Sequence, residues 1–599
     1  MKFRDRAALF SYRLQSRHAV SAWLILVFIF LSVPLAAREL PVLCEKDVPV
    51  PMRDGTILRA NICRPAEGGP YPVLVHRTPY GKMQGGKLER YARAGYIVVT
   101  QDARGRHASD GQFESFVRFE TRDAVDGYDT VEWAAKLPGS TGKVGTFGAS
   151  YDSFLQWRLA SLRPPSLVAM SASSVPARYT DLEGPWKLRP GRRLAWWYYT
   201  ISPNLHRKAG TDAPHLSGDP KTSWKNGEGE RLLNLFPRMD LPDWLFGSEA
   251  DAVKFWMKNA QLDPWQLDKG CRDIAVPNLD IIGWYDHCNG SIDMHQATRK
   301  HGFTKVAREN QRLIIGPWSH SGRGARKVGK FDFGPDAALD TAQEEIRWFD
   351  YWLKGEDNGV ADESPVRIFI MGANRWRNEP EWPPRRAESQ TLYLSSGGHA
   401  NTPSGDGALG NTRPKRAGLD RFVYDPRDPV PTLWTEAMFT VPADQRPHAK
   451  RQDILVYQTE PLAEVVEVTG YPEVVLHAAS SAPDTDFFAR LIDVAPDGSS
   501  RDVASGMVRA RYRKGLDKSR LLEPGTAAKF VIRMGPTANE FQPGHRIRLD
   551  ITSSDFPNYD VNHNTAADQN VDATRVTALQ TIHHGGWLSS RLILPVIGK

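Results

Sequence analysis

One serine has the position and spacing of a possible nucleophile. Ser150 follows the apolar segment 142–147, which indicates a buried strand, and precedes segment 155–160, where apolar residues recur near helical spacing. Gly148 leaves room for a sharp strand-to-helix turn that would raise the serine above a sheet. Asp152 stands where the usual Gly-x-Ser-x-Gly pattern has its last glycine, so a serine in an ordinary turn is the alternative.

An aspartate and a histidine complete the set that acyl-transfer chemistry needs. Such chemistry uses a serine activated by a base, with the base oriented by an acid. Asp286 follows the strand-like segment 277–283, and His320 follows the strand-like segment 312–316. The chain order Ser, Asp, His is that of α/β-hydrolases. Taken singly, an aspartate in a loop is usually solvated, and a histidine is often a surface or packed residue.

The elements around these residues predict an α/β domain with a mainly parallel sheet. Strands that alternate with helices are typical of this class. The strand-like segments are 71–76, 96–100, 142–147, 277–283 and 312–316, and the helix-like segments are 88–94, 123–136 and 344–353. Because ligand-binding groups usually follow the carboxyl ends of such strands, Ser150, Asp286 and His320 are expected to meet at one edge of the sheet.

Two further regions differ from this alternating pattern. Residues 175–270 are rich in Trp, Tyr, Pro and charge, and they could form a cap above the site or a plain helical subdomain with aromatic packing. From residue 388 onwards, short strand-like pieces with turns between them favour an all-β sandwich or jelly roll. We therefore expect an α/β domain over 45–385, with the insertion inside it, and an all-β domain over 388–599.

The N-terminus has the order of a secretory signal. Basic residues precede the apolar run 19–31, and small residues follow up to Ala37, where a signal could be cut. Leu35 suits such a cut poorly, and the run approaches the about 20 residues that span a bilayer. Residues 1–37 are thus a signal peptide or an uncleaved anchor, and either places the body outside the cytoplasm, in the periplasm or secreted.

The charge pattern argues against a nucleic-acid partner. The 599-residue chain has a formal net charge of +7, but much of that surplus lies in the first 17 residues. The other charges are mixed in sign, and no basic run interleaves with aromatic residues. Contact with a membrane is expected only through the N-terminal segment.

Four cysteines fit an oxidising compartment. Cys44 and Cys63 lie nearly equidistant from the turn of a predicted hairpin, so they could face each other across its strands. Cys271 and Cys288 would then form a second pair. Sequence does not settle connectivity, and four buried free thiols are the alternative. No Cys/His cluster has the spacing of a zinc site, and we expect neither a metal nor a cofactor.

Several short segments resemble those of a known group of enzymes. They are 148–151, 283–286, 316–320, 371–376 and 553–557, with support from 102–105 and 109–111. Over roughly residues 45–599 the chain resembles the cocaine esterase and X-Pro dipeptidyl-peptidase group of serine hydrolases, close also to glutaryl acylases and α-amino acid ester hydrolases. The resemblance implies that Ser150, Asp286 and His320 form the catalytic triad.

The resemblance also implies a fold and an oxyanion hole. The group has an α/β-hydrolase domain, a helical cap and a C-terminal jelly roll. The backbone N–H of Tyr151 and the hydroxyl of Tyr80 would stabilise the oxyanion. The group usually has glycine three residues after the serine, where this chain has Ser153. Serine is small, so the turn is expected to survive.

These features predict a serine hydrolase that cleaves an ester or amide of a small molecule through a covalent acyl-enzyme. An X-Pro dipeptidyl-peptidase is the alternative among enzymes, and it would need an acidic group for the substrate amine. Asp181 and Glu183 in the expected cap are candidates for that group. A secreted non-catalytic binding protein that uses the jelly roll is the alternative of another class.

Overall fold

The computed structural model describes residues 41–598, apart from 119–120, 180–188, 212–218, 260–261, 264 and 434–441. The predicted signal or anchor over 1–37 therefore lies outside the described residues, as do Asp181 and Glu183. Within the described part of the chain, no helix is long and apolar enough to cross a membrane.

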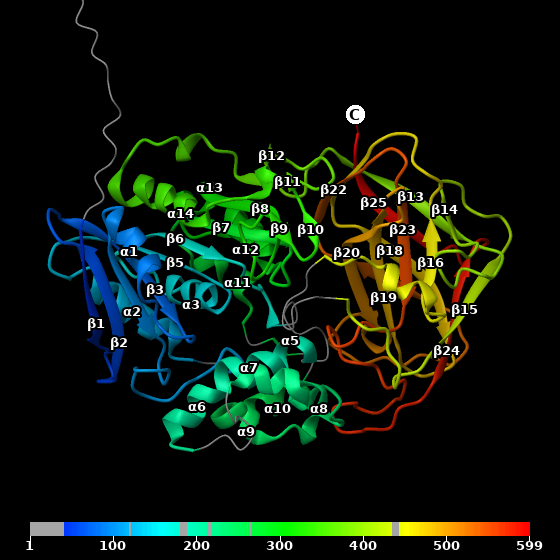
Figure 1. Ribbon diagram of the computed structural model, residues 1–599, viewed down its shortest axis with the longest axis horizontal. Coiled ribbons are helices and arrows are strands. Elements are labelled where there is room, and N and C mark those ends of the chain that lie inside the picture. Colours follow the sequence, from blue (N-terminus) through cyan, green and yellow to red (C-terminus); the bar gives the residue numbers. More distant parts are fainter. Residues whose placement is uncertain are drawn as a thin grey trace, which may run out of the picture. The chain divides into compact units, whose positions relative to one another are not determined.

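A ten-stranded sheet is the scaffold of the first part of the chain, the α/β domain (Figure 1). Its strand order is β1-β2-β4-β3-β5-β6-β7-β8-β11-β12. Neighbours from β4 to β11 run parallel, whereas β1, β2 and β12 pair antiparallel. The predicted parallel α/β sheet is confirmed. The strands are β1 (Val42–Pro51), β2 (Ile57–Pro65), β3 (Tyr71–Thr78), β4 (Ile97–Asp102), β5 (Ser140–Ala149), β6 (Leu167–Ser173), β7 (Asn278–Tyr285), β8 (Gln311–Ser319), β11 (Val366–Ile370) and β12 (Arg375–Glu379).

Helices connect these strands as the alternating pattern predicts. The helix predicted over 344–353 is present: it is α-helical over Thr341–Phe349 and continues as a π-helical segment over Asp350–Lys354. Strands β9 (Lys327–Val328) and β10 (Phe331–Asp332) form a separate small hairpin. The helices are α1 (Gly86–Arg93), α2 (Asp123–Ala134), α3 (Tyr151–Ala160), α12 (Gly290–His301), α13 (Lys305–Glu309) and α14 (Thr341–Phe349).

The first hairpin carries a disulfide. The register of β1 and β2 places Cys44 opposite Cys63, with their Cα atoms 4.2 Å apart, and the two are bonded as the hairpin spacing predicts. The second expected pair is not formed, since neither Cys271 nor Cys288 is in a disulfide. Both thiols are buried in the apolar core, where a free cysteine behaves as a small hydrophobic residue.

The chain between β6 and β7, here called the insertion, is helical among its described residues. Several of its aromatic residues are interior, since Trp197, Tyr198 and Trp256 are almost fully buried. Large aromatic side chains supply much apolar area to a small subdomain, so they hold these short helices together. The helices are α5 (Pro190–Ala195), α6 (Ser202–Ala209), α7 (Pro220–Ser223), α8 (Gly229–Leu233), α9 (Asp243–Phe246), α10 (Ala250–Lys258) and α11 (Leu267–Gly270) (Figure 1).

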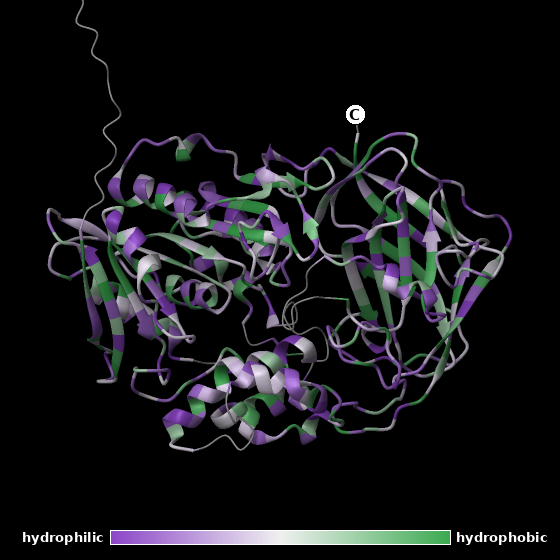
Figure 2. Ribbon diagram, in the orientation of Figure 1, coloured by the Kyte–Doolittle hydropathy of each residue, from purple (hydrophilic) through white to green (hydrophobic). Residues whose placement is uncertain are grey.

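From Ala387 the chain forms a thirteen-stranded arrangement, the β domain. Hydrophobic and hydrophilic residues alternate along its strands (Figure 2), and in β24 alternate residues are buried. The all-β prediction is confirmed, whereas the jelly-roll topology stays a prediction. The strands are β13 (Ala387–Ser395), β14 (Ala408–Gly410), β15 (Gly418–Tyr424), β16 (Leu455–Gln458), β17 (Val466–Gly470), β18 (Glu473–Ser480), β19 (Asp486–Val494), β20 (Ser500–Arg509), β21 (Ala528–Arg533), β22 (Thr537–Phe541), β23 (Arg546–Thr552), β24 (Ala578–His584) and β25 (Arg591–Ile597).

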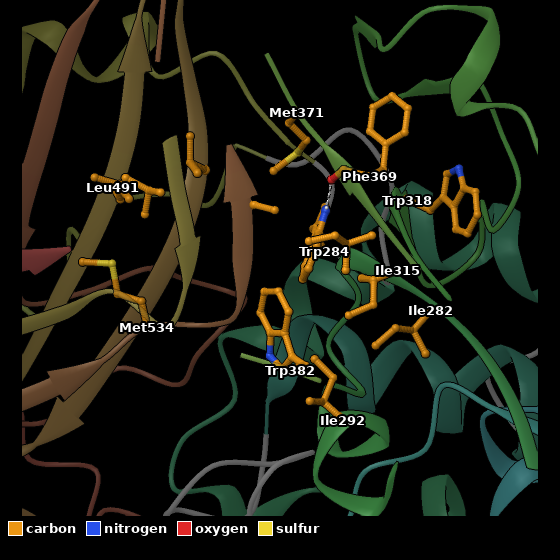
Figure 3. Close-up of a cluster of buried hydrophobic side chains, with 14 of the residues drawn as sticks. Ile282, Trp284, Ile292, Ile315, Trp318, Phe369, Met371, Trp382, Leu491 and Met534 are labelled. Atoms are coloured by element: carbon orange, nitrogen blue, oxygen red, sulfur yellow. Dashed lines mark hydrogen bonds between the residues drawn. The ribbon is translucent and has the colours of Figure 1, made fainter. Parts of the chain in front are cut away.

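One apolar core continues from the parallel sheet into the β domain (Figure 3). Trp284 of β7 belongs to this core, and its indole N–H donates to the carbonyl of Phe369 over 2.8 Å. Leu491 and Met534 of the β domain belong to the same cluster. Because Trp284 lies two residues before Asp286, this packing immobilises the end of β7, where Asp286 is placed.

Candidate active site

Ser150 occupies a strained turn between β5 and α3. Its φ is 64° and its ψ is −122°, a conformation that residues with side chains rarely adopt. Gly148 has a φ of 138°, and a Cβ at that position would lie 2.7 Å from the Cβ of Asp152. The backbone therefore needs glycine at 148, and it presents Ser150 as a nucleophile elbow does.

The two departures from the expected elbow pattern are accommodated. Asp152 reaches a buried histidine that the sequence analysis missed, since its Oδ2 lies 2.9 Å from Nε2 of His76. The Nδ1 of His76 in turn lies 3.1 Å from the hydroxyl of Thr100. Ser153 is fully buried on the first turn of α3. The carboxylate of Asp152, in a position where glycine is expected, is the sequence feature that could have indicated the contact with His76. A buried carboxylate needs a partner.

Asp286 and His320 form a buried acid–base pair. The Nδ1 of His320 lies 2.8 Å from Oδ1 of Asp286, which also accepts the backbone N–H of Cys288 over 2.8 Å. Burial opposes ionisation of Asp286, but the charge of His320 and these hydrogen bonds outweigh it and lower the pKa of the carboxyl. Asp286 therefore stays ionised and orients the imidazole of His320.

A second histidine, also missed by the sequence analysis, packs against this pair. The ring centroids of His287 and His320 are 4.4 Å apart. Burial lowers the pKa of His287 well below its usual value, and the neighbouring His320, Arg189 and Arg193 lower it further. His287 is consequently a neutral imidazole near neutral pH, and it adds no positive charge beside His320.

Ser150 and His320 line the same cavity, which has a volume of about 260 Å³. The walls come from the turn after β3, the elbow, the ends of β7 and β8, and the insertion. Aromatic and apolar side chains predominate. Among the described residues the lining consists of Tyr80, Phe116, Ser150, Tyr151, Phe154, Pro176, Arg192, Arg193, Trp196, Thr200, Trp265, His287, Cys288 and His320.

Tyr80 and Tyr151, both in the lining of this cavity, carry the two predicted oxyanion donors. The indole N–H of Trp196 donates to the Tyr80 hydroxyl oxygen over 3.2 Å, so the phenolic proton is left for another acceptor. Desolvation of this hydroxyl raises its pKa, and Asp152 adds to the shift, which keeps the group protonated. Tyr151 is the first residue of α3, where a backbone N–H has no acceptor within the helix.

The same neighbourhood could also hold a metal ion. Among the residues that the structure describes, Asp286, His287, Cys288 and His320 offer ligand atoms within 4.8 Å of one another. Imidazole, thiolate and carboxylate are ligands that suit Zn²⁺. However, two of these residues form the acid–base pair, so an ion bound there would compete with proton transfer.

The parallel sheet, the elbow serine and the Asp286–His320 pair define an α/β-hydrolase. The X-Pro dipeptidyl-peptidase (S15 family) pattern matches residues 54–322, and the X-Pro dipeptidyl-peptidase C-terminal non-catalytic domain matches residues 358–593. Together with the relatives below, these matches show that the chain belongs to the cocaine esterase and X-Pro dipeptidyl-peptidase-like family of α/β-hydrolases.

Individual relatives agree with this assignment. The chain is 36% identical over 584 residues to the cocaine esterase of Rhodococcus sp. (strain MB1 Bresler), covering 92% of this chain and 98% of that one. A solved α-amino acid ester hydrolase has 25% identity and a TM-score of 0.75, covering 96% of this chain and 100% of that one. An aminopeptidase from a marine sediment Thaumarchaeota archaeon shares the fold, with 24% identity, a TM-score of 0.76 and coverage of 94% and 97%.

These findings confirm the predicted enzyme class. The protein is a serine hydrolase that acts on ester or amide bonds, and the alternative of a non-catalytic binding protein is wrong.

Proposed function

We propose that the protein is an esterase whose catalytic triad is Ser150, His320 and Asp286. The observation that carries this proposal is the 2.8 Å contact between His320 and Asp286 at a cavity that also contains Ser150. The strained elbow and the order of the three residues along the chain support it.

The reaction follows from these positions. His320 accepts the Ser150 proton as the serine oxygen attacks the ester carbonyl, and Asp286 stabilises the imidazolium that forms. The Tyr80 hydroxyl and the Tyr151 N–H donate to the developing oxyanion. His320 then protonates the departing alcohol, and water, deprotonated by the same base, releases the acyl group from Ser150.

Esters are favoured as substrates over X-Pro peptides. The relative that matches over 98% of its own length is an esterase by name. A dipeptidyl-peptidase would need an acidic group to bind the substrate amine, and the described residues that line the cavity include no carboxylate. Asp181 and Glu183, the candidates for that role, lie outside the described residues.

Covalent labelling tests the triad. A fluorophosphonate probe should label the peptide that contains Ser150, and both the label and ester turnover should be lost in Ser150→Ala. Ser161→Ala, at the end of the same helix, is the matched control and should behave like wild type. Label on another serine, or normal turnover in a folded Ser150→Ala variant, would remove Ser150 from the mechanism.

We further propose that the enzyme is exported. The order of basic, apolar and small residues over 1–37 supports this, as does the Cys44–Cys63 disulfide, since disulfides persist mainly in oxidising compartments. Cell fractionation with N-terminal sequencing tests it. Export with a new terminus after Ala37 indicates a cleaved signal, export with an intact terminus indicates an anchor, and cytoplasmic protein refutes the proposal.

A further inference from the structure

One guanidinium group at the cavity has no partner within the described residues. Arg192 lies on α5 and is 4% exposed, and it lines the same cavity as Ser150 and His320. Its Nη1 and Nη2 atoms are both buried, and neither has a hydrogen-bond partner among the described residues. Buried charged groups are normally paired, so such a group in a substrate cavity indicates that the bound molecule supplies the acceptor.

A second guanidinium group also lines the cavity. It belongs to Arg193 and lies 4.9 Å from the ring centroids of both Phe116 and Trp196. No carboxylate belongs to the lining among the described residues. The environment therefore favours an anionic or neutral molecule and disfavours an ammonium group.

The backbone that carries Arg192 is held firmly. The N–H of Gly191 donates to the carbonyl of Pro557 over 2.8 Å, which ties the start of α5 to the β domain. Pro557 ends the segment 553–557, one of the segments that resemble the enzyme group. This contact gives the segment a role, which is to position the helix that bears Arg192.

We propose that Arg192 selects substrates that carry a carboxylate. This inference rests on the proposed esterase function and names its substrate class: esters with an anionic carboxylate on the acyl or the alcohol half, joined to the reacting carbonyl through an apolar segment. The planar guanidinium can donate hydrogen bonds from both Nη atoms to one carboxylate. A lysine ammonium cannot reproduce this bidentate geometry. The aromatic wall formed by Phe116, Phe154, Trp196 and Trp265 fits the apolar segment.

A matched substrate panel tests the selection in the wild-type enzyme. The acyl series is monomethyl adipate, methyl heptanoate and methyl 6-(trimethylammonio)hexanoate, which are anionic, neutral and cationic. The alcohol series is the acetate esters of 4-hydroxyphenylacetic acid and of 4-ethylphenol. We expect the anionic ester to have the highest kcat/KM in at least one series, and the cationic ester to have the lowest in its own. A neutral ester that equals or exceeds the anionic one in both series would overturn the proposal.

Variants assign the selection to Arg192. In Arg192→Met the ratio of kcat/KM for the anionic to the neutral ester should fall about tenfold or more, because a charge-assisted hydrogen bond is lost. Arg192→Lys should retain part of the ratio. Arg231→Met is the matched control, because Arg231 belongs to the same insertion but pairs with Glu228 on an exposed face. An unchanged ratio in folded Arg192→Met would refute the role of Arg192.

A binding measurement separates this inference from the esterase proposal. Ser150→Ala removes the attacking oxygen, so calorimetry can follow the binding of the anionic ester of the preferred series to that variant without hydrolysis. Adding Arg192→Met should weaken this binding about tenfold or more. Equal binding by Ser150→Ala and by the double variant would refute the carboxylate site. If the wild-type enzyme neither hydrolyses esters nor is labelled at Ser150, the esterase proposal itself is refuted.

Discussion

Individual hydrogen bonds and burial around the cavity set the orientation or the protonation state of each polar group. The Trp196 indole occupies a lone pair of the Tyr80 oxygen, so the phenolic proton can point elsewhere. His320 keeps Asp286 ionised, and burial keeps His287 neutral. In the proposed mechanism, His320 is therefore the histidine of this pair that gains a proton during turnover.

Tyr80→Phe should lower kcat about a hundredfold, because removal of one oxyanion donor costs on the order of 3 kcal/mol. Steady-state kinetics on an ester gives this number, and fluorophosphonate labelling of Ser150 checks that the site is intact. Tyr198→Phe is the control, since the Tyr198 hydroxyl pairs with Ser223 away from the cavity lining. A kcat equal to that of the control would exclude the Tyr80 hydroxyl as a donor.

Asp280 makes stability depend on pH. This residue of β7 is 1% exposed, and burial raises its pKa to about 7. In the unfolded chain the Asp280 carboxyl loses its proton at about pH 4. Between about pH 4 and 7 the folded state therefore binds more protons than the unfolded state, and the stability of the fold falls as pH rises. In Asp280→Asn the decline in Tm over this range should be smaller. Asp123, whose pKa burial also raises to about 7, should maintain part of it. Equal declines in variant and wild type would contradict the account.

At the scale of elements, the end of the β7–β8 pair sets the distance between acid and base. The register shifts here, because Gly283 pairs with Gly316 whereas Tyr285 pairs with Ser319. A Cβ on Gly283 would lie 1.9 Å from the carbonyl oxygen of Trp318. This close approach lets the two strands end so that the residues that follow them, Asp286 and His320, meet.

Gly283→Ala should disrupt this arrangement. The added methyl group collides with backbone, which cannot move aside cheaply, so we expect a lower Tm and a large loss of kcat. Thermal unfolding and ester kinetics measure the two effects. Gly270→Ala is the control, since a Cβ there meets no atom within 4 Å. If both variants behave alike, the close approach does not position the pair.

At the scale of the whole described chain, the β domain supports the site through the insertion. Arg238 of the insertion is fully buried and makes two hydrogen bonds to Asp560, of 2.9 and 2.7 Å. The N–H of Met239 donates to the carbonyl of Asn570. The Tyr285 hydroxyl, one residue before Asp286, donates to the carbonyl of Asp502 over 3.0 Å. The β domain thus restrains both the insertion and the end of β7.

Asp560→Ala should destabilise the protein by about 3–5 kcal/mol, because it leaves the Arg238 charge buried without its carboxylate. The midpoint of denaturant unfolding measures this loss. Glu460→Ala is the control, since that side chain is exposed in its ion pair with Arg546 and should contribute at most about 1 kcal/mol. Equal midpoints for the two variants would show that the buried pair adds nothing.

Much of this architecture could be predicted because its signals are local. Strand and helix periods and the turn glycine at 148 can be identified from residues close in the chain, and the order Ser150, Asp286, His320 can be read from the sequence directly. The predicted pairing of Cys271 with Cys288 was wrong. It rested on elimination alone, and nothing in the sequence around these two cysteines indicates that their elements lie side by side. The helix predicted over 344–353 changes from α-helical to π-helical at Asp350, a change that apolar spacing does not indicate.

The class of fold, the elbow serine and the candidate acid and base can be predicted from the sequence, since they depend on short-range pattern and chain order. Three contacts come from the tertiary structure: Asp152 pairs with His76, His287 packs on His320, and Arg192 lines the cavity with no hydrogen-bond partner among the described residues for its Nη atoms. Those contacts join residues from different elements. They depend on strand register and on how the insertion packs, which no local spacing specifies.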